Sequence, residues 1–254
     1  MSASAHQPYL PWLLPGESFP NPQKAWGPNT AAPGLLAAGA DLSPSTLIDA
    51  YRQGIFPWFS EGEPPLWWFT QPRMVLQTAQ FRLTDSLRKQ IRTELKRGHL
   101  KITFDTAFSE VIHACASIHR AGQHGTWISP DMETAYNRLH QMGVAHSVEV
   151  WWDNQLAGGL YGLGLGRMVY GESMFARRSN ASKIALCALV AFCRAENLPA
   201  IDCQQVTRHL QNMGATPITG MSFQQLLQTL VEQPKPTWRF ESQHLDALLN
   251  WRHP

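Results

Sequence analysis

The chain has 254 residues, which is long enough to bury a sizeable hydrophobic core in one large domain or two modest ones. Its 44% hydrophobic and 16% charged residues are typical of a globular protein, and a net charge of +2 neither requires nor excludes a nucleic-acid partner. Residues 1–14 lack the basic start and apolar run of a signal peptide, and no apolar run is long enough to span a bilayer. We therefore expect a cytoplasmic protein with no membrane partner.

The cysteine and histidine patterns argue against a metal or cofactor site. The four cysteines are scattered and include no CxxC pair, so they predict neither a zinc site nor a disulfide framework. The ten histidines include no HExxH motif, and His113, His119 and His124 lie too far apart to form a one-turn metal pair. We expect no metal and no cofactor.

The N-terminal part combines loops, one helix and many aromatic residues. The first forty residues are rich in Pro and Gly, which predicts extended and looped structure. Ser43 and Pro44 are a typical N-cap and first residue of a helix, which Gly54 is expected to end. The aromatic residues that follow either cement a small domain or line a pocket. Because the character changes between residues 77 and 81, we predict a small domain at 1–78 and a larger one at 79–254.

The segment 84–97 is predicted to be a helix with a basic face. Leu87, Ile91 and Leu95 form its apolar stripe. Clustered positive charge is what a phosphate backbone requires, although a solvated helix face is the commoner explanation of such a run. The basic residues considered for tRNA binding are Arg82, Arg88, Lys89, Arg92, Lys96 and Arg97.

The middle of the chain predicts strands and a hairpin. A short strand at 102–104 is followed by helices at 107–118 and from Ser129 to Gly143. Alternating residues then predict an antiparallel hairpin of strands 145–152 and 155–161. The glycines between 158 and 166 do not fit a dinucleotide-binding motif, because a strand rather than a helix follows them.

A strand, a buried helix and a second strand follow between residues 168 and 204. A helical crossover normally returns the second strand parallel to the first in the same sheet. Because strand side chains alternate between faces, Asp202 and Gln204 are expected to share one face. If the strands are neighbours, Glu172, Asp202 and Gln204 form one polar patch beside Met174.

The start of the connecting helix suits a phosphate. Asn180 or Ser182 is the expected N-cap, and Lys183 lies in the first turn, where a cation gains nothing from the helix dipole. A lysine beside free helix amides is a reasonable phosphate site, although an ordinary cap with a solvated lysine explains the pattern equally well. Short helices are predicted at 207–213 and 222–232, and the tail from Gln233 carries little information.

Several motifs occur together in a fixed order, including YRQGIFPWF at 51–59, GESMF at 171–175 and IDCQ at 201–204. The remaining motifs lie at 34–37, 41–44, 125–128, 145–151 and 181–183. The ordered set closely resembles the bacterial leucyl/phenylalanyl-tRNA–protein transferases, from about Phe19 to Glu232. The chain departs from that family at Ala40, at residues 69–71 and at Leu160, where the family can have Met.

The resemblance implies an α+β fold, with a small N-terminal domain packed on a larger acetyltransferase-like (GNAT-like) domain that has a mixed sheet flanked by helices. It also implies the reaction. Leu or Phe, less often Met, is moved from its tRNA to the α-amine of a protein with N-terminal Arg or Lys, which marks that protein for degradation. We expect the enzyme to be a monomer.

The resemblance and the residues together suggest a mechanism. The aminoacyl ester is already activated, so the enzyme mainly aligns an amine with a carbonyl, and orientation can supply about 7 to 11 kcal/mol. Gln204 would accept a hydrogen bond from the amine, and Asp202 would orient that amide and take up positive charge. Glu172 and Asp202 would make the acceptor pocket acidic and so favour Arg or Lys.

The remaining site residues are assigned to the two ends of the aminoacyl-tRNA. The Leu or Phe side chain is expected to contact Trp58, Trp127, Leu160, Met174, Phe175 and Ile201. The terminal phosphate is assigned to Asn180 and Lys183, with Ser182 as a further substrate-binding residue, and the acceptor stem is assigned to the basic helix.

Three other functions compete with this interpretation. The first is an acyltransferase of the same fold that uses an acyl-coenzyme A, although no matching pyrophosphate loop precedes a helix. The second is a hydrolase with Cys203 as nucleophile and His146 or His209 as base. The third is a tRNA-binding protein without catalysis.

Overall fold

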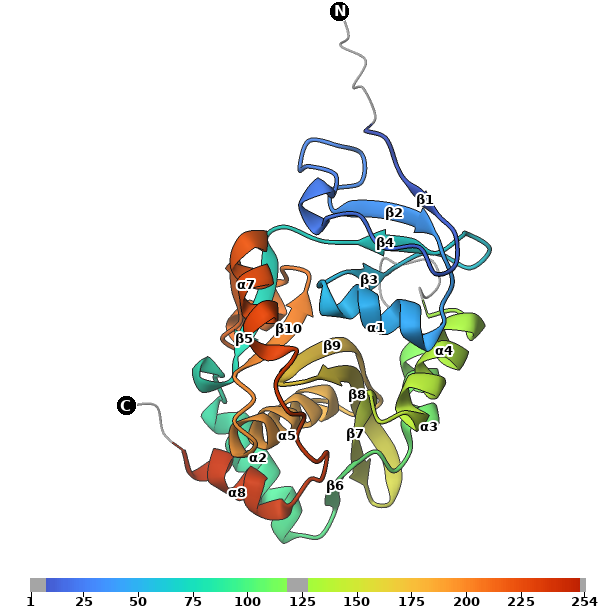
Figure 1. The fold of residues 1–254 in the computed structure, drawn as a ribbon. Helices are drawn as coiled ribbons and strands as arrows, with labels where there is room; N and C mark the ends of the chain where they lie inside the picture. Colours follow the sequence, from blue (N-terminus) through green and yellow to red (C-terminus); the bar gives the residue numbers. More distant parts are fainter. Residues whose placement is uncertain (1–7, 118–127, 252–254) are drawn as a thin grey trace, which may run out of the picture.

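The computed structural model describes residues 8–117 and 128–251, which form two β-sheets and the helices that cover them (Figure 1). A four-stranded sheet has the order β1-β2-β4-β3, and a seven-stranded sheet has the order β11-β5-β10-β9-β8-β7-β6. Both sheets contain parallel and antiparallel pairs. The fold is therefore mixed α+β, as the sequence predicts.

The small sheet and one helix make up the N-terminal part of the molecule. Its elements are β1 (Trp12–Leu13), β2 (Leu35–Gly39), α1 (Pro44–Arg52), β3 (Phe56–Pro57) and β4 (Leu66–Trp68), together with a 3-10 turn at Pro22–Lys24. Ser43 is the N-cap of α1, and its hydroxyl accepts a hydrogen bond from Thr46 N–H. The predicted start of this helix is confirmed.

The change from the small sheet to the large one falls before residue 78. β5 (Arg73–Gln77) pairs with β10 and β11 and is therefore a strand of the large sheet. The partners of β5 lie more than 120 residues later in the chain, so local composition could not reveal them. We propose a domain boundary in the link between Trp68 and Arg73, instead of at residue 78.

The large sheet contains the predicted hairpin and the predicted parallel pair. Its other strands are β6 (Leu100–Phe104), β7 (Ala145–Trp152), β8 (Gln155–Leu165), β9 (Met168–Ala176), β10 (Ala200–Gln204) and β11 (Thr216–Ile218). β7 and β8 are antiparallel, with Trp152 opposite Gln155 across the tight turn. β10 runs parallel to β9, its neighbour in the sheet. The glycines from 158 to 164 lie in β8, and β9 follows them, which confirms that a strand and not a helix comes after the glycine-rich segment.

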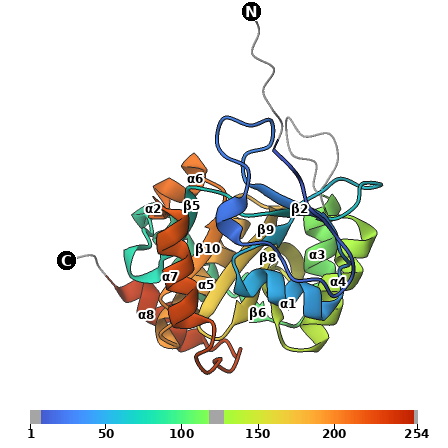
Figure 2. The same cartoon turned by 45° about the horizontal axis from the view of Figure 1, so that its top comes forward.

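Helices cover both faces of the large sheet (Figures 1 and 2). On one face α1 and the small sheet share a hydrophobic core with α3 (Phe108–Ser117), α4 (Pro130–Gln141) and α7 (Gly220–Leu230). The other face is covered by α2 (Asp85–Lys96), α5 (Ala181–Ala195) and α8 (Ser242–Asn250). The short helices η2 (Thr78–Gln80) and α6 (Arg208–Asn212) complete the set. None of the helices in the described ranges is long and apolar enough to cross a membrane.

Of the helices on this second face, α5 was predicted from its sequence pattern and α8 was not. Every residue of α5 from Ile184 to Cys193 is buried, as its uniformly apolar sequence predicts. In α8, Leu245, Leu248 and Leu249 are buried at helical spacing against α5, so the C-terminal region completes the core of this face.

Candidate active site

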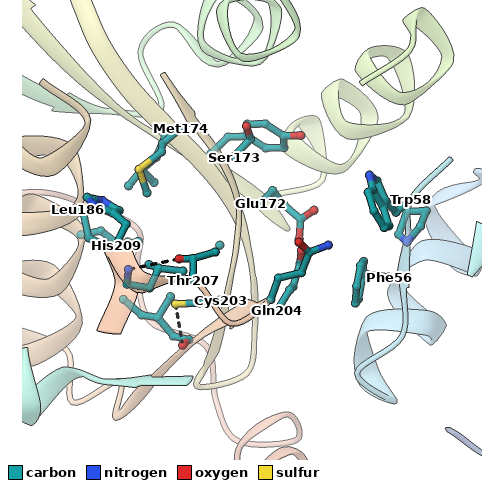
Figure 3. A pocket seen from close by; sticks show the side chains of 18 residues that line it. Phe56, Trp58, Glu172, Ser173, Met174, Leu186, Cys203, Gln204, Thr207 and His209 are labelled. Carbon is teal, nitrogen blue, oxygen red and sulfur yellow. Dashed lines mark hydrogen bonds between the residues drawn. The ribbon is translucent and has the colours of Figure 1, made fainter. Parts of the chain in front are cut away.

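A pocket opens where β9 and β10 stop pairing. The two strands pair through Ala200–Asp202 and Met168–Tyr170, after which β9 continues to Ala176 while β10 ends at Gln204. A cavity of about 400 Å³ occupies this opening. Its walls come from β3, β8, β9, β10, α5 and α6, so both sheets contribute to it. Figure 3 shows Glu172 and Gln204 between an aromatic end, with Phe56 and Trp58, and an opposite end, with Met174 and Leu186.

A bulge in β9 directs Glu172 into this pocket. Gly162 pairs with Gly171 and Tyr161 pairs with Ser173, so Glu172 has no opposite residue on β8. Its Oε1 accepts a hydrogen bond from Gln204 Nε2 at 2.9 Å. Its Oε2 accepts one from the Tyr136 hydroxyl at 3.3 Å. The position of Glu172 next to Gln204, expected from the sequence, is confirmed.

Burial raises the pKa of Glu172 to about 8. The hydroxyl groups of Tyr51 and Tyr136 act in the opposite direction, and the nearby charge of Asp202 adds to the rise. No Lys, Arg or His of the described residues forms an ion pair with Glu172. Glu172 is therefore a carboxyl group that can gain or lose a proton near neutral pH.

Asp202 lies beneath the pocket and does not line it. The side chain is fully buried, and its two oxygens accept hydrogen bonds from Arg73 Nε at 2.8 Å and Arg73 Nη2 at 2.6 Å. The buried guanidinium in turn packs on the rings of Phe56 and Phe223. Asp202 is therefore paired with Arg73 and does not line the pocket, which differs from the expected position of this carboxylate in an acidic acceptor pocket.

A second bulge separates Gln204 from Asp202. The register on β5 shifts between them, and Gln204 has a φ of 57°, in the left-handed region. Asp202 Oδ1 accepts a hydrogen bond from Gln204 N–H at 2.9 Å, and Thr70 Oγ1 donates to Gln204 O at 3.2 Å. Asp202 thus orients the backbone of Gln204, not its side-chain amide. The bulge explains why the simple alternation of strand faces failed here.

Gln204 lines the pocket next to Glu172. Its Nε2 donates to Glu172, and within the described chain its Oε1 accepts no hydrogen bond. An acceptor atom that faces a cavity beside a titratable carboxyl group can hold an amine and assist the loss of its proton.

The alternative nucleophile, Cys203, is poorly placed for thiolate chemistry. Burial raises the pKa of this thiol to about 12, so the reactive thiolate is scarce at neutral pH. His146 lies on β7, where it bonds Asp105 and stacks on Trp238, and it does not line the pocket. His209 lines the pocket, and burial lowers its pKa. These positions do not support a cysteine hydrolase.

Comparison with known proteins identifies the family. The family model for the leucyl/phenylalanyl-tRNA protein transferase matches residues 75–228, and the model for its N-terminal domain matches residues 40–71. The chain belongs to this family. It is 55% identical to the leucyl/phenylalanyl-tRNA–protein transferase of Polaromonas sp. over 96% of each chain. It is 52% identical to that of Albidiferax ferrireducens over 97% of each chain. The chain is therefore an aminoacyltransferase that acts on aminoacyl-tRNA and proteins.

Similarity to solved structures is weaker. The structure of L-PGS from Bacillus licheniformis aligns with a TM-score of 0.37 and 9% identity, over 80% of this chain and 65% of that chain. This level of similarity does not test the acetyltransferase-like part of the fold prediction.

Four of the six residues predicted to contact the Leu or Phe side chain line the pocket of this transferase, namely Trp58, Leu160, Met174 and Ile201. Phe175 does not line it. Its side chain points to the opposite face of β9, where it is buried, and Arg177 covers its ring. Trp127 lies outside the described residues.

Several lining residues of the transferase pocket were not predicted. Leu186 and Leu189 on α5 and Leu210 on α6 extend the apolar wall, and His209 lies beside Leu210. Because α5 is apolar on all sides, its sequence could not show which side faces the pocket. Tyr51 and Tyr136, which lead from Glu172 into the core, were also missed as site residues. The motif at 51–59 contains Tyr51 and could have drawn attention to it.

The substrate-binding residues predicted at the start of α5 cluster beside α2, outside the pocket lining. Asn180 is the N-cap of α5 and makes no capping hydrogen bond through its side chain. Instead, Asn180 Nδ2 donates to Gln90 Oε1 at 2.9 Å, and Asn180 Oδ1 accepts from Lys183 Nζ at 3.2 Å. Ser182, in the first turn, is partly buried. The charge of Lys183 also contributes to lowering the pKa of His209, so the cluster lies near the end of the pocket formed by α6.

The basic residues in and beside α2 differ in their hydrogen-bond partners. Arg88 Nη1 donates to Leu248 O at 3.2 Å and also to Leu249 O, and Arg92 Nη2 donates to Leu249 O at 2.9 Å. These carbonyls lie at the C-terminal end of α8, where a helix attracts cations. Arg88 and Arg92 therefore have a structural role that the sequence interpretation missed. Arg92 is nevertheless exposed, as are Arg82, Lys89, Lys96 and Arg97, the last of which pairs with Glu94 at 3.2 Å.

Proposed function

We propose that this transferase moves Leu or Phe, and less often Met, from tRNA to the α-amine of proteins that begin with Arg or Lys. The main support for this proposal is the hydrogen bond between Gln204 and Glu172 in the pocket between β9 and β10. There an amide oxygen that accepts no hydrogen bond within residues 8–117 and 128–251 lies near a titratable carboxyl group and an apolar wall.

The apolar end of the pocket suits the transferred side chain. Leu160, Met174, Leu186 and Ile201 line it, and its volume of about 400 Å³ accommodates a Leu, Phe or Met side chain. A flexible Met in the wall suits a site that accepts several apolar shapes. Such a pocket rejects polar side chains strongly but separates apolar ones that differ by one methylene only weakly.

Gln204 is assigned to hold the attacking amine. Its Oε1 would accept a hydrogen bond from the amine and point the nitrogen lone pair at the ester carbonyl. The C–N bond forms, and the bond between that carbonyl carbon and the ribose oxygen breaks. Asp202 and Arg73 contribute indirectly, because they fix the left-handed backbone that directs Gln204 into the pocket.

Glu172 is the remaining candidate for recognition of the acceptor's charge. Because Arg73 neutralises Asp202, the attraction for an N-terminal Arg or Lys depends on Glu172. A bound cation would favour its carboxylate form and lower its pKa from about 8.

The tRNA is assigned to the side of the molecule with α2. Asn180 and Lys183 would contact the terminal phosphate beside the start of α5, with Ser182 as a further substrate-binding residue. The exposed basic residues Arg82, Lys89, Lys96 and Arg97 would contact the acceptor stem.

The remaining predictions concern the context of the reaction. We propose that the transferase is a monomer with an acetyltransferase-like core and that it requires no cofactor. Because the donor is aminoacyl-tRNA, the reaction is assigned to the cytoplasm. Addition of Leu or Phe would mark the acceptor protein for degradation.

Transfer of labelled amino acids to short peptides tests this function. We expect leucine-charged tRNA to label a peptide that begins with Arg, and not the same peptide with an acetylated N-terminus. Phenylalanine-charged tRNA should also serve as donor, and serine-charged tRNA should not. Equal labelling of peptides that begin with Arg and with Glu would contradict the proposed acceptor specificity. Labelling of the acetylated peptide would contradict reaction at the α-amine.

A further inference from the structure

A chain of hydrogen bonds leads from the pocket into the core between α1 and α4. Gln204 Nε2 donates to Glu172 Oε1, and the Tyr136 hydroxyl donates to Glu172 Oε2. The hydroxyl oxygens of Tyr136 and Tyr51 lie 2.5 Å apart, and both tyrosines are fully buried. Recognition of a charged acceptor side chain does not require this buried network.

The other carboxylate near the site does not line the pocket. Asp202 is sealed beneath the pocket, and both of its oxygens bond the Arg73 guanidinium. Glu172 lines the pocket, and the groups that surround it are neutral donors rather than cations. Tyr51 on α1 and Tyr136 on α4 face it directly, whereas the charges of Asp202 on β10 and Arg73 on β5 reach it through space.

We propose that Glu172 accepts the proton that the acceptor's α-amine loses during transfer, and that Tyr136 and Tyr51 position the carboxylate for this step. This inference rests on the proposed function. As the C–N bond forms, one N–H proton passes to a Glu172 oxygen. As the ester C–O bond breaks, that proton passes to the departing ribose oxygen, which restores the carboxylate. No other reactant is needed.

The geometry suits this role. An amine bound at Gln204 Oε1 lies next to Glu172, because Gln204 Nε2 bonds the Glu172 carboxylate directly. The Tyr136 hydroxyl bonds Oε2 and Gln204 bonds Oε1, and each carboxylate oxygen keeps a second lone pair that can accept a proton. Burial raises the pKa of Glu172, so its carboxylate is a stronger base than an exposed one.

The first test separates proton transfer from charge recognition. Single-turnover transfer is measured for the wild type and Glu172→Gln, with peptides that begin with Arg or with citrulline, its uncharged analogue. We expect the variant to be slower by about a hundredfold or more with both peptides. A defect with Arg that disappears with citrulline would mean that Glu172 pairs only with the guanidinium, and would overturn the inference while leaving the proposed function intact. Failure of the wild type to modify the Arg peptide would overturn both.

The second test uses the pH dependence of Tyr136→Phe. This substitution removes a donor that favours the Glu172 carboxylate, so the pKa of Glu172 should rise. The defect in rate should therefore be large at pH 6, about tenfold for each unit of pKa change, and should narrow toward pH 8.5.

The matched control for this test is Tyr170→Phe. Its buried hydroxyl donates to Tyr51 O and does not bond Glu172. We expect its pH profile to have the same shape as that of the wild type. An equal loss for Tyr136→Phe at every pH would indicate a merely structural role and overturn the positioning assignment.

Discussion

Asp202 and Glu172 are two carboxyl groups on neighbouring strands with opposite surroundings. Asp202 is fully buried and bonded by both Nε and Nη2 of Arg73. Glu172 is partly buried and receives hydrogen bonds from neutral groups, Gln204 and Tyr136. Asp202 has a cation as its partner, whereas Glu172 has none among the described residues, and burial raises the pKa of Glu172.

This difference gives Asp202 a structural role and makes Glu172 a candidate for the chemical step. A sealed ion pair cannot exchange protons with a substrate, but it can fix the backbone that carries Gln204. A carboxyl group beside a cavity has the opposite properties. A related distinction applies to α2, where Arg88 and Arg92 bond carbonyls of α8, whereas the exposed Lys89 and Lys96 form no ion pair within the described residues.

The largest expected effect comes from breaking the sealed pair. Arg73→Met should lower the free energy of unfolding by about 3 to 5 kcal/mol, because it leaves the Asp202 charge buried without a partner. Denaturant unfolding measures this loss. The control is Arg52→Met, which removes an exposed pair with Glu232 and should cost about 1 kcal/mol or less. Equal losses for the two variants would contradict the distinction between sealed and exposed charges.

The pH dependence of stability should reveal the unpaired carboxyl group. Because burial raises the pKa of Glu172 from 4.5 to about 8, the folded state binds its proton more tightly than the unfolded state does. This stabilisation is fully present below about pH 4.5 and is lost as the pH rises through about 8. Since solvent reaches the pocket, we expect a loss of roughly 2 kcal/mol from pH 5 to pH 8.5.

Glu172→Gln should flatten this dependence. Unfolding is followed over the same pH range, with the exposed Glu61→Gln as the matched control, which should behave like the wild type. Parallel pH profiles for the wild type and Glu172→Gln would mean that Glu172 does not titrate differently in the folded state.

The basic residues of α2 should separate into two groups. Changing Arg88 and Arg92 to Ala should cost about 1 kcal/mol each in stability, because the C-terminal carbonyls of α8 lose their donors. Changing Lys89 and Lys96 to Ala should leave stability unchanged and weaken the binding of charged tRNA. The slope of log affinity against log salt should fall by about 1 for each phosphate that is no longer neutralised. Unchanged affinity and slope in the lysine variant would remove α2 from the tRNA-binding surface.

The smallest effect is expected at Cys203. Because burial raises the pKa of its thiol to about 12, thiol reagents should inactivate the enzyme slowly, and Cys203→Ala should retain most of the transfer rate. Peptide labelling by the treated and untreated enzymes measures this. Rapid inactivation that Cys203→Ala abolishes would assign the thiol a role that its surroundings do not support.

The sequence predicted features that depend on local patterns. The N-caps at Ser43 and Ser129, the β7–β8 hairpin and the buried helix α5 follow from spacing, capping residues and hydrophobicity. The crossover rule also predicted that β10 lies parallel to β9. Glu172 and Gln204 could thus be brought together without coordinates.

The remaining features depend on contacts between distant residues. Arg73 and Asp202 are 129 positions apart, and Tyr51 and Tyr136 are 85 apart, so no local pattern connects them. The bulge at Gln204 is equally hidden, because a non-glycine residue in the left-handed region leaves no sign in the sequence. For this reason the sequence placed Asp202 in the pocket, whereas the structure places it beneath.

The single-turnover rate of leucine transfer with Gln204→Ala tests the central claim most directly. The assay uses leucine-charged tRNA, saturating enzyme and a peptide that begins with Arg, with the exposed Gln211→Ala as the matched control. We expect Gln204→Ala to be slower by at least about tenfold with unchanged affinity for charged tRNA, and Gln211→Ala to match the wild type. A wild-type rate for Gln204→Ala would show that transfer does not depend on the pocket between β9 and β10.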